Sequence, residues 1–210
     1  MVRVSAKSAS KKSSAHKSVQ SLNVKRVVLD RAAWIVEARE ALIKGGIASV
    51  KIGKLATRLD VTRESFYWHF KNLQELHDEL LQDWETTTTS AHAALLDPQH
   101  DGAKEFLSMV HFHLDKQRFN PAWNSAVRDW ARVARPVELA VSRVDEHIVE
   151  MIKQMFLDMG YDEIESLIRA RITHFHQIGY YNVNPGESEQ ERMRLLPVYV
   201  RLLTGLPLME

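Results

Sequence analysis

The sequence has no cysteine among its 210 residues. Disulfide frameworks, thiol catalysis and cysteine-ligated zinc or iron–sulfur centres are therefore excluded. It also lacks the run of about 18 apolar residues that a membrane-spanning helix requires, and its polar N-terminus differs from a secretion signal. We expect a soluble, cytoplasmic protein with no membrane partner and no cofactor.

Alternating polar and apolar residues, the pattern of a half-buried strand, are missing as well, and the sequence has no internal repeat. Hydrophobic residues make up 45% of the chain and charged residues 26%, an ordinary composition for one or two globular domains. The apolar residues instead recur at three- and four-residue steps, which is typical of helices with one buried face. The predicted fold class is all-α.

Acidic residues are missing from the first 26 positions, which hold seven bases and carry a charge of +7. Residues 27–71 add +3 and residues 72–210 carry −9, so a basic front end precedes an acidic remainder. This asymmetry indicates a polyanionic partner for the front end. Residues 1–26, rich in Ser, Lys and Ala, predict a disordered basic arm that either follows a nucleic-acid backbone or only improves solubility.

Three helical segments follow the basic arm. The pair Gly45-Gly46 ends the first of them, and Thr62 is the predicted N-cap of the third. The second and third are short, are joined by a tight turn and form a helix-turn-helix candidate, so we assign residues 27–74 to a DNA-binding domain. The predicted segments are 30–45, 52–59 and 62–70.

Longer helical segments fill residues 75–210, which we assign to a helical regulatory and dimerisation domain. Pro121 and Pro136 are predicted at first helical positions, where proline is tolerated, whereas Pro197 predicts a break in the last segment. The predicted segments are 72–96, 102–117, 121–134, 136–159, 162–183 and 188–204.

The third segment mixes apolar residues with polar and aromatic ones. Phe66 and Phe70 lie four residues apart and predict its buried face. The other side chains would then face outward, where a helix in the major groove of DNA contacts base edges and phosphates. Tyr67 or Trp68 alternatively packs at the junction with the next helix. The outward residues are Arg63, Glu64, Ser65, Tyr67, Trp68, His69 and Lys71.

Over about residues 27–84 the sequence resembles the tetracycline-repressor (TetR) family of bacterial transcription regulators. The likeness is strongest in Lys54-Leu55-Ala56 and in the run Phe66-Tyr67-Trp68-His69-Phe70-Lys71-Asn72, which is similar to the end of the family's recognition helix. The resemblance implies that bases are read by Arg63, Glu64 and Ser65, that phosphates are bound by Tyr67 and His69, and that Trp68 packs against the DNA backbone or a thymine methyl.

The resemblance also implies a phosphate contact from Lys54 and the start of its helix. Many members have Ser or Thr as the cap before this helix. Lys51 stands there in this chain, so the contact would come from its ammonium group or from Ser49. Some members also have Lys or Arg where this chain has Leu73, which removes one phosphate contact.

One recognition helix covers only a few base pairs, so we expect a homodimer that binds a palindromic operator. Its two recognition helices would lie about 34–36 Å apart or somewhat more. The resemblance implies a four-helix interface formed by segments 162–183 and 188–204 of each chain. Their apolar residues serve this interface, the core of one chain, or both, and are Ile164, Leu167, Ile168, Ile172, Phe175, Leu195, Leu196, Val200 and Leu203.

Apolar side chains with a few polar ones on three central segments predict a cavity for a small, mostly apolar effector. Ordinary core packing explains the same pattern. The pairs His111/His113 and His174/His176 do not close on one metal ion, because residues two apart point about 200° from each other around a helix. The candidate effector residues are Met109, His113, Trp123, Val127, Trp130, His147 and Met151.

These features predict a sequence-specific transcriptional regulator, a repressor released from its operator by a small-molecule effector, and not an enzyme. Two other classes stay open. An architectural protein would bind DNA without sequence preference through the basic arm. A small helical enzyme would use His113 or His147 as a base, although the sequence offers no nucleophile with an activating partner and no phosphate-binding glycine loop.

Overall fold

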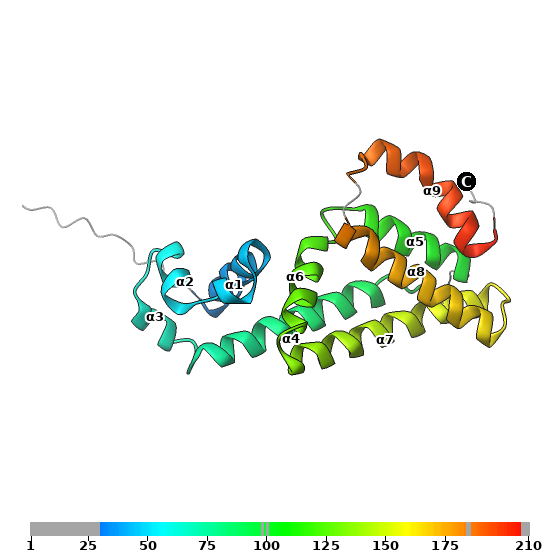
Figure 1. Cartoon of the computed structure of the whole chain (residues 1–210). Helices are drawn as coiled ribbons and strands as arrows, with labels where there is room; N and C mark the ends of the chain where they lie inside the picture. Colours follow the sequence, from blue (N-terminus) through cyan, green and yellow to red (C-terminus); the bar gives the residue numbers. More distant parts are fainter. Residues whose placement is uncertain (1–29, 98, 100, 184–185, 207–210) are drawn as a thin grey trace, which may run out of the picture.

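The computed structural model describes residues 30–97, 99, 101–183 and 186–206. Within these ranges the chain forms helices and turns without strands, which confirms the all-α fold class. The predicted basic arm lies outside the described residues. Figure 1 shows the first helices gathered at one end of the molecule: α1 (Arg31–Gly45), the short 3-10 helix η1 (Ile47–Ser49), α2 (Ile52–Arg58) and α3 (Arg63–Tyr67).

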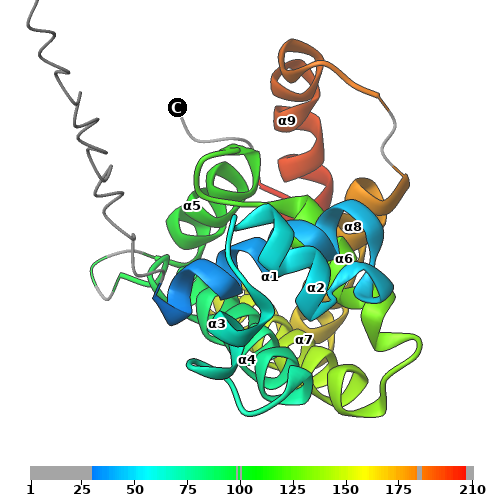
Figure 2. The same cartoon turned by 90° about the vertical axis from the view of Figure 1, so that its left-hand side faces the viewer.

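We call this group, residues 31–71, the head. The other helices form the body, and in the view of Figure 2 the head lies in front of it. The body consists of α4 (Leu73–Ala93), α5 (Gly102–Leu114), α6 (Pro121–Ala131), α7 (Arg135–Asp158), α8 (Glu163–Val183) and α9 (Glu189–Thr204).

The head is built around the buried face of α1. Trp34, Ala38 and Leu42 of this helix are fully or almost fully buried, at the four-residue spacing that keeps side chains on one face. The carboxylate of Asp30 caps α1 by accepting a hydrogen bond from the amide of Ala33, at 2.9 Å. Gly46 ends the helix with a φ of 66°, a conformation that favours glycine.

Helix α3 is shorter than the sequence predicts. It ends at Tyr67, and the amide of His69 then donates to the carbonyl of Phe66, at 2.9 Å, in a tight turn. The chain must leave the helix here because Asn72 adopts an extended conformation and caps α4 by accepting from the amide of Glu75. Thr62 occupies the predicted N-cap position of α3, but its side chain makes no capping hydrogen bond.

Helix α4 connects head and body. The predicted domain boundary after residue 74 falls in its first turn, and the helix continues from there without interruption into the body. Its buried residues recur every four positions from Leu76 to His92. The indole N–H of Trp84, in the middle of α4, donates to the Asn124 side chain of α6 at 3.0 Å. Head and body therefore share a helix and its core.

Helix α1 also reaches the body directly. The guanidinium of Arg39 forms an ion pair with Asp83 of α4 and lies over the Trp123 ring of α6, 5.3 Å from its centroid. His77 of α4 contacts Trp130 of α6 edge to face, with 5.6 Å between ring centroids. Burial lowers the pKa of His77, so this junction holds a neutral imidazole.

Helix α7 is the central helix of the body and packs against α4, α5, α6 and α8. Helix α5 approaches it closely at Gly102, where an added Cβ would lie 2.1 Å from the carbonyl oxygen of Met155. The carboxylate of Asp162 accepts bonds from the amides of Ile164 and Glu165, both at 2.9 Å, and so caps α8.

The predicted break at Pro197 is wrong, because α9 continues through it from Glu189 to Thr204. Proline removes one N–H and frees the carbonyl of the residue four positions earlier, here Met193. Met193 and Pro197 are both exposed, so water can satisfy this carbonyl. Within the described ranges, no helix is long and apolar enough to cross a bilayer.

Candidate nucleic-acid interface and body cavities

Two phenylalanines hold α3 against the head. Phe66 and Phe70 are buried and stack on each other with ring centroids 5.1 Å apart. Phe66 also contacts Trp34 of α1 edge to face at 5.3 Å, a favourable aromatic geometry. The opposite side of α3 is thereby turned toward solvent.

The exposed side of α3 carries most of the predicted DNA-binding residues. Trp68 is 73% exposed and Tyr67 59%, so neither ring packs at the junction with α4. Ser65 and His69 are half-buried. The fully exposed members of the predicted set are Arg63, Glu64, Tyr67, Trp68 and Lys71 of the α3 region, together with Lys51 and Lys54 beside α2.

A concave basic surface lies beside α3, between α1 and α2. Arg63 lies across α2 so closely that a Cβ on Gly53 would approach its guanidinium to 2.4 Å. Arg58 is paired with Glu37 and Lys44 with Glu40, whereas no ion pair of Lys51, Lys54 or Arg63 is found within the described residues. These three cations remain available to an anionic partner. The surface is lined by Lys44, Ser49, Lys51, Gly53, Lys54, Thr57, Arg58 and Arg63.

The start of each short helix is open. Lys51 is the N-cap of α2 and Thr62 is the N-cap of α3. Neither side chain makes a capping hydrogen bond. The pKa of Glu64 in the first turn of α3 is lowered by its backbone hydrogen bond and by the Thr62 hydroxyl. Glu64 is thus ionised and can accept hydrogen bonds only.

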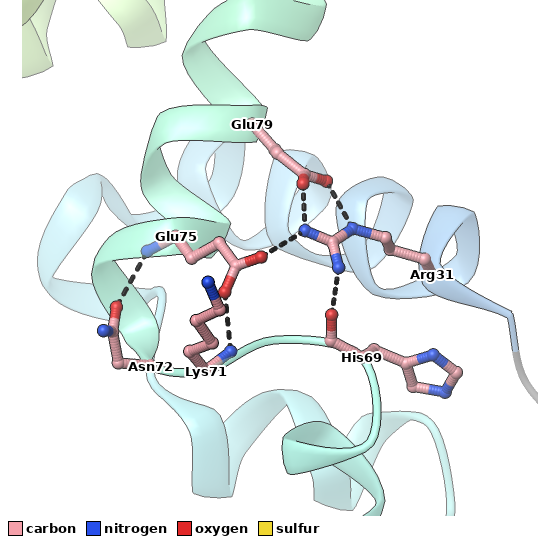
Figure 3. Close-up of polar contacts among 6 residues, drawn as sticks. All are labelled: Arg31, His69, Lys71, Asn72, Glu75 and Glu79. Carbon is pink, nitrogen blue, oxygen red and sulfur yellow. Dashed lines mark hydrogen bonds and ion pairs between the residues drawn. The ribbon is translucent and has the colours of Figure 1, made fainter.

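Arg31 of α1 holds the end of the α3 region in place (Figure 3). Its guanidinium contacts Glu75 at 2.6 Å and Glu79 at 2.8 Å, and it also donates to the carbonyl of His69. The amide of Lys71 donates to Glu75 at 2.6 Å. Hydrogen bonding to Arg31 lowers the pKa of Glu75, and the two carboxylates raise that of Arg31. This cluster joins α1, α4 and the segment that carries His69 and Lys71.

The body contains two neighbouring cavities, of about 90 and 40 Å³. The larger lies among α5, α7, α8 and α9, and the smaller among α4, α5, α6, α7 and α8. His113, Gln177 and His174 line both of them. The wall between the cavities is therefore polar, although most of the larger cavity is apolar.

The predicted effector residues are placed differently from one another. Met109 and His113 line the larger cavity. The other five line neither cavity: Trp123, Val127, Trp130 and Met151 are buried in the core, and His147 is exposed on α7. Val144 and Ile148 of the same helix point into the body, whereas His147 lies on a different face of the helix.

Sequence reasoning did not identify the cavity residues of α8 and α9, because it considered only the apolar residues of these segments, for the dimer interface, the core of one chain, or both. Polar residues at helical spacing on α8 were the available signal, since Thr173, His174 and Gln177 all line the larger cavity. Tyr180, Arg192 and Tyr199 complete the polar side of the larger cavity.

Burial keeps two histidines of this region, His92 and His113, neutral. Desolvation lowers the pKa of His113 to about 3, and it also lowers the pKa of His92, whose ring centroid lies 5.4 Å away. The Nε2 of His174 instead bonds to Asp145 at 2.8 Å, and Arg128 bonds to the same carboxylate at 2.5 Å. Within the described residues, no group of three or more His, Asp or Glu is arranged to hold a metal ion.

A short exposed helix, held by apolar residues on a three-helix head and flanked by cations that form no ion pair with any described residue, is the arrangement of helix-turn-helix DNA-binding proteins. Residues 35–80 match the bacterial regulatory proteins of the tetR family. The resemblance predicted from the third helical segment is thus confirmed over these residues.

Two solved structures are similar over most of the chain. A transcriptional regulator from Rhodococcus sp. Rha1 is 13% identical, with a TM-score of 0.62 over 84% of this chain and 92% of that one. It supports the fold of head and body together. BioQ with its natural double-stranded DNA operator is 22% identical, with a TM-score of 0.45 over 84% of this chain and 96% of that one.

Proposed function

We propose that this protein is a sequence-specific transcriptional repressor that binds a palindromic operator as a homodimer and is released by a small effector. The observation that carries the proposal is the exposed side of α3, where Tyr67 and Trp68 face solvent while Phe66 and Phe70 are buried. Large aromatic side chains exposed beside cations are costly to leave in water and suit a DNA surface.

The residues have distinct roles in this proposal. Base edges are read by Arg63, Glu64 and Ser65, at the first turn of the recognition helix, where helix-turn-helix proteins place their base contacts. Phosphates are contacted by Tyr67, His69 and Lys71 on one side and by Lys51 and Lys54 on the other, and Trp68 packs against the backbone or a thymine methyl.

A dimer is supported by an uncovered apolar stripe on α8. Ile164, Ile168, Ile172 and Phe175 recur at three- and four-residue steps and are 76%, 47%, 52% and 55% exposed. Leu202 of α9 is 70% exposed. Such a contiguous stripe is unusual on a monomer and fits a two-fold helical interface.

Effector release is supported by contacts that connect the cavities to the head. His174 lines both cavities and bonds to Asp145, which holds Arg128 of α6. Helix α6 in turn packs on α1 of the head. An effector that moved this wall would change the position of α6 and hence the spacing of the two heads, which is a rigid-body type of coupling.

Selection of bound sequences from a random DNA pool tests the proposal, and a palindromic consensus is the expected result. Arg63→Ala should then lower affinity for the consensus about 10- to 100-fold while lowering affinity for random DNA much less, because base contacts specify sequence. Lys17→Ala and Lys25→Ala are the controls, since a basic arm should affect all sequences alike and flatten the salt dependence.

Equal losses on selected and random DNA for Arg63→Ala would instead favour an architectural, non-specific DNA-binding protein. Of the two candidate bases of the enzyme alternative, His147 is exposed and lines neither cavity, whereas burial lowers the pKa of His113, which lines both cavities, to about 3 and so makes it a weak base. We therefore propose no catalytic role.

A further inference from the structure

The wall between the two body cavities carries two polar atoms for which no hydrogen bond is found within the described residues. His113, Gln177 and His174 line both cavities, so a group placed at this wall meets all three side chains. The Nε2 of His174 is already bonded to Asp145. The other two residues decide what kind of ligand the wall can hold.

His113 presents a hydrogen-bond acceptor. Its Nδ1 lies 3.0 Å from the carbonyl oxygen of Met109, and a carbonyl can only accept, so Nδ1 carries the proton. Burial lowers the pKa of His113 to about 3, so the ring is neutral and its Nε2 is unprotonated. Among the described residues no donor bonds to this Nε2.

Gln177 presents a donor. Its Nε2 is buried and has no hydrogen-bond partner within the described residues, which is rare for an amide in a folded protein. An N–H donor buried in this way is satisfied only by an acceptor that enters the cavity. The wall therefore offers one acceptor and one donor to the same incoming group.

The rest of the larger cavity argues for a neutral, apolar ligand. Its side chains include Met109, Ile152 and Leu196. Arg192 and Glu187 both line it, so the cavity carries balanced charge and gives an ion no net counter-charge. Volumes of about 90 and 40 Å³ are together comparable to the engineered cavity of about 150 Å³ that binds benzene.

From this geometry we infer that the effector site takes a neutral, hydroxyl-bearing molecule of about the size of a substituted phenol. Its O–H donates to Nε2 of His113, its oxygen accepts from Nε2 of Gln177, and its apolar part fills the larger cavity. A hydroxyl is the smallest group that both donates and accepts. The inference rests on the proposed function only in calling this molecule an effector.

The test measures binding of three matched compounds to the full chain by calorimetry, without DNA. They are p-cresol, which donates and accepts, 4-methylanisole, which only accepts, and toluene, which does neither. We expect p-cresol to bind about tenfold more tightly than 4-methylanisole and toluene to bind most weakly. Equal affinities, or tighter binding of the anion 4-methylbenzoate, would overturn the inference.

Variants locate the effect at the wall. His113→Phe and Gln177→Leu should each lower the affinity for p-cresol about tenfold and leave that for toluene unchanged. His111→Phe and Gln154→Leu, exposed residues on α5 and α7, are matched controls that should change neither. Gln177→Leu removes an unpartnered amide, so its thermal midpoint should be equal or higher, which separates lost recognition from lost folding.

A separate measurement keeps the two proposals apart. Operator affinity with and without p-cresol reports on the regulator, whereas calorimetry without DNA reports on the site. Selective p-cresol binding without any effect on operator affinity would contradict effector release and leave the ligand class standing. A protein that binds its operator selectively but binds none of the compounds would contradict the ligand class and leave the proposed DNA-binding function standing.

Discussion

Arg31 and His113 are both basic side chains, yet their surroundings give them opposite charge states. Two carboxylates, Glu79 and Glu75, raise the pKa of Arg31, so it is a permanent cation that joins α1 to α4. Burial among apolar and aromatic groups lowers the pKa of His113 to about 3. Arg31 positions the segment that carries His69 and Lys71, and His113 remains a neutral acceptor in a cavity.

The depressed pKa of His113 predicts a pH-dependent stability. Unfolding restores an ordinary histidine pKa near 6.5, so below that pH the unfolded chain binds a proton that the folded chain does not. The free energy of unfolding should therefore fall as the pH drops from about 6.5 toward 3, by up to about 1.4 kcal/mol per pH unit from this group. The nearby basic groups His92, His174 and Arg192 also lower the pKa of His113.

Urea unfolding of the His113→Phe variant at pH 7.5, 6.0 and 5.0 checks this. Its stability should vary less with pH than that of the unaltered protein, and His111→Phe, on the exposed side of the same helix, should leave the variation unchanged. Identical slopes in all three proteins would show that His113 titrates normally in the fold.

At the scale of the element, α8 has two faces with different tasks. Its inner face buries Ala170, Thr173 and His174 against the body and lines the cavities. Its outer face exposes the stripe of Ile164, Ile168, Ile172 and Phe175. One helix thus belongs both to the cavity wall and to the proposed dimer interface.

Ile168→Asp should dissociate the proposed dimer. The two-fold axis would place two carboxylates in an apolar interface, so we expect the dissociation constant of the dimer to rise at least 100-fold, measured by sedimentation. Operator affinity should fall with it. Val133→Asp, at a residue 75% exposed after α6, is the control and should leave the mass unchanged. A protein that is monomeric before substitution would contradict the proposed interface.

The sequence predicted most elements because their boundaries depend on local chemistry. Asp30, Asn72, Asn120 and Ser188 cap helices within three residues of themselves, and such bonds are readable from spacing. The end of α3 at Tyr67 was not predicted, because the chain must leave the helix early enough for Asn72 to adopt an extended conformation and cap α4. Pro197 was misread because a solvent-facing carbonyl tolerates the missing N–H, and exposure is a tertiary property.

At the scale of the whole molecule, α4 and α6 connect the DNA-facing head to the cavities. The indole of Trp84, fully buried in α4, has its donor satisfied by Asn124 of α6. Arg39 joins α1 to Asp83 and lies over Trp123. Arg39 thereby joins α1 of the head to α4 and α6 of the body, and we expect head and body to unfold as one cooperative unit.

Asn124→Ala should lower the stability of this whole unit. It leaves the buried N–H of Trp84 without an acceptor, which costs about 1–3 kcal/mol of unfolding free energy. Tryptophan fluorescence and helical circular dichroism should still report one coincident urea transition, shifted to lower concentration. Asn182→Ala, at the exposed end of α8, is the control. Two separate transitions would show that the head folds independently of the body.

Of the candidate site, the recognition surface was predictable and the cavity was not. The alternation of Phe66 and Phe70 with polar residues shows which side of the third helical segment is buried, because a helix repeats every 3.6 residues. The two cavities are lined from six different helices, α4 to α9, and no local period indicates which of their inward faces meet. Five of the seven predicted effector residues lie elsewhere for this reason.

The sequence by itself determined the all-α class, the positions of most helices and the buried side of the third helical segment, since each follows from spacing and capping within a few residues. Only the tertiary structure decided that Trp68 is exposed, that α9 continues through proline, and that His113 and Gln177 line one wall. These depend on which distant helices pack together, and so on the burial that sets charge state and hydrogen-bond partners.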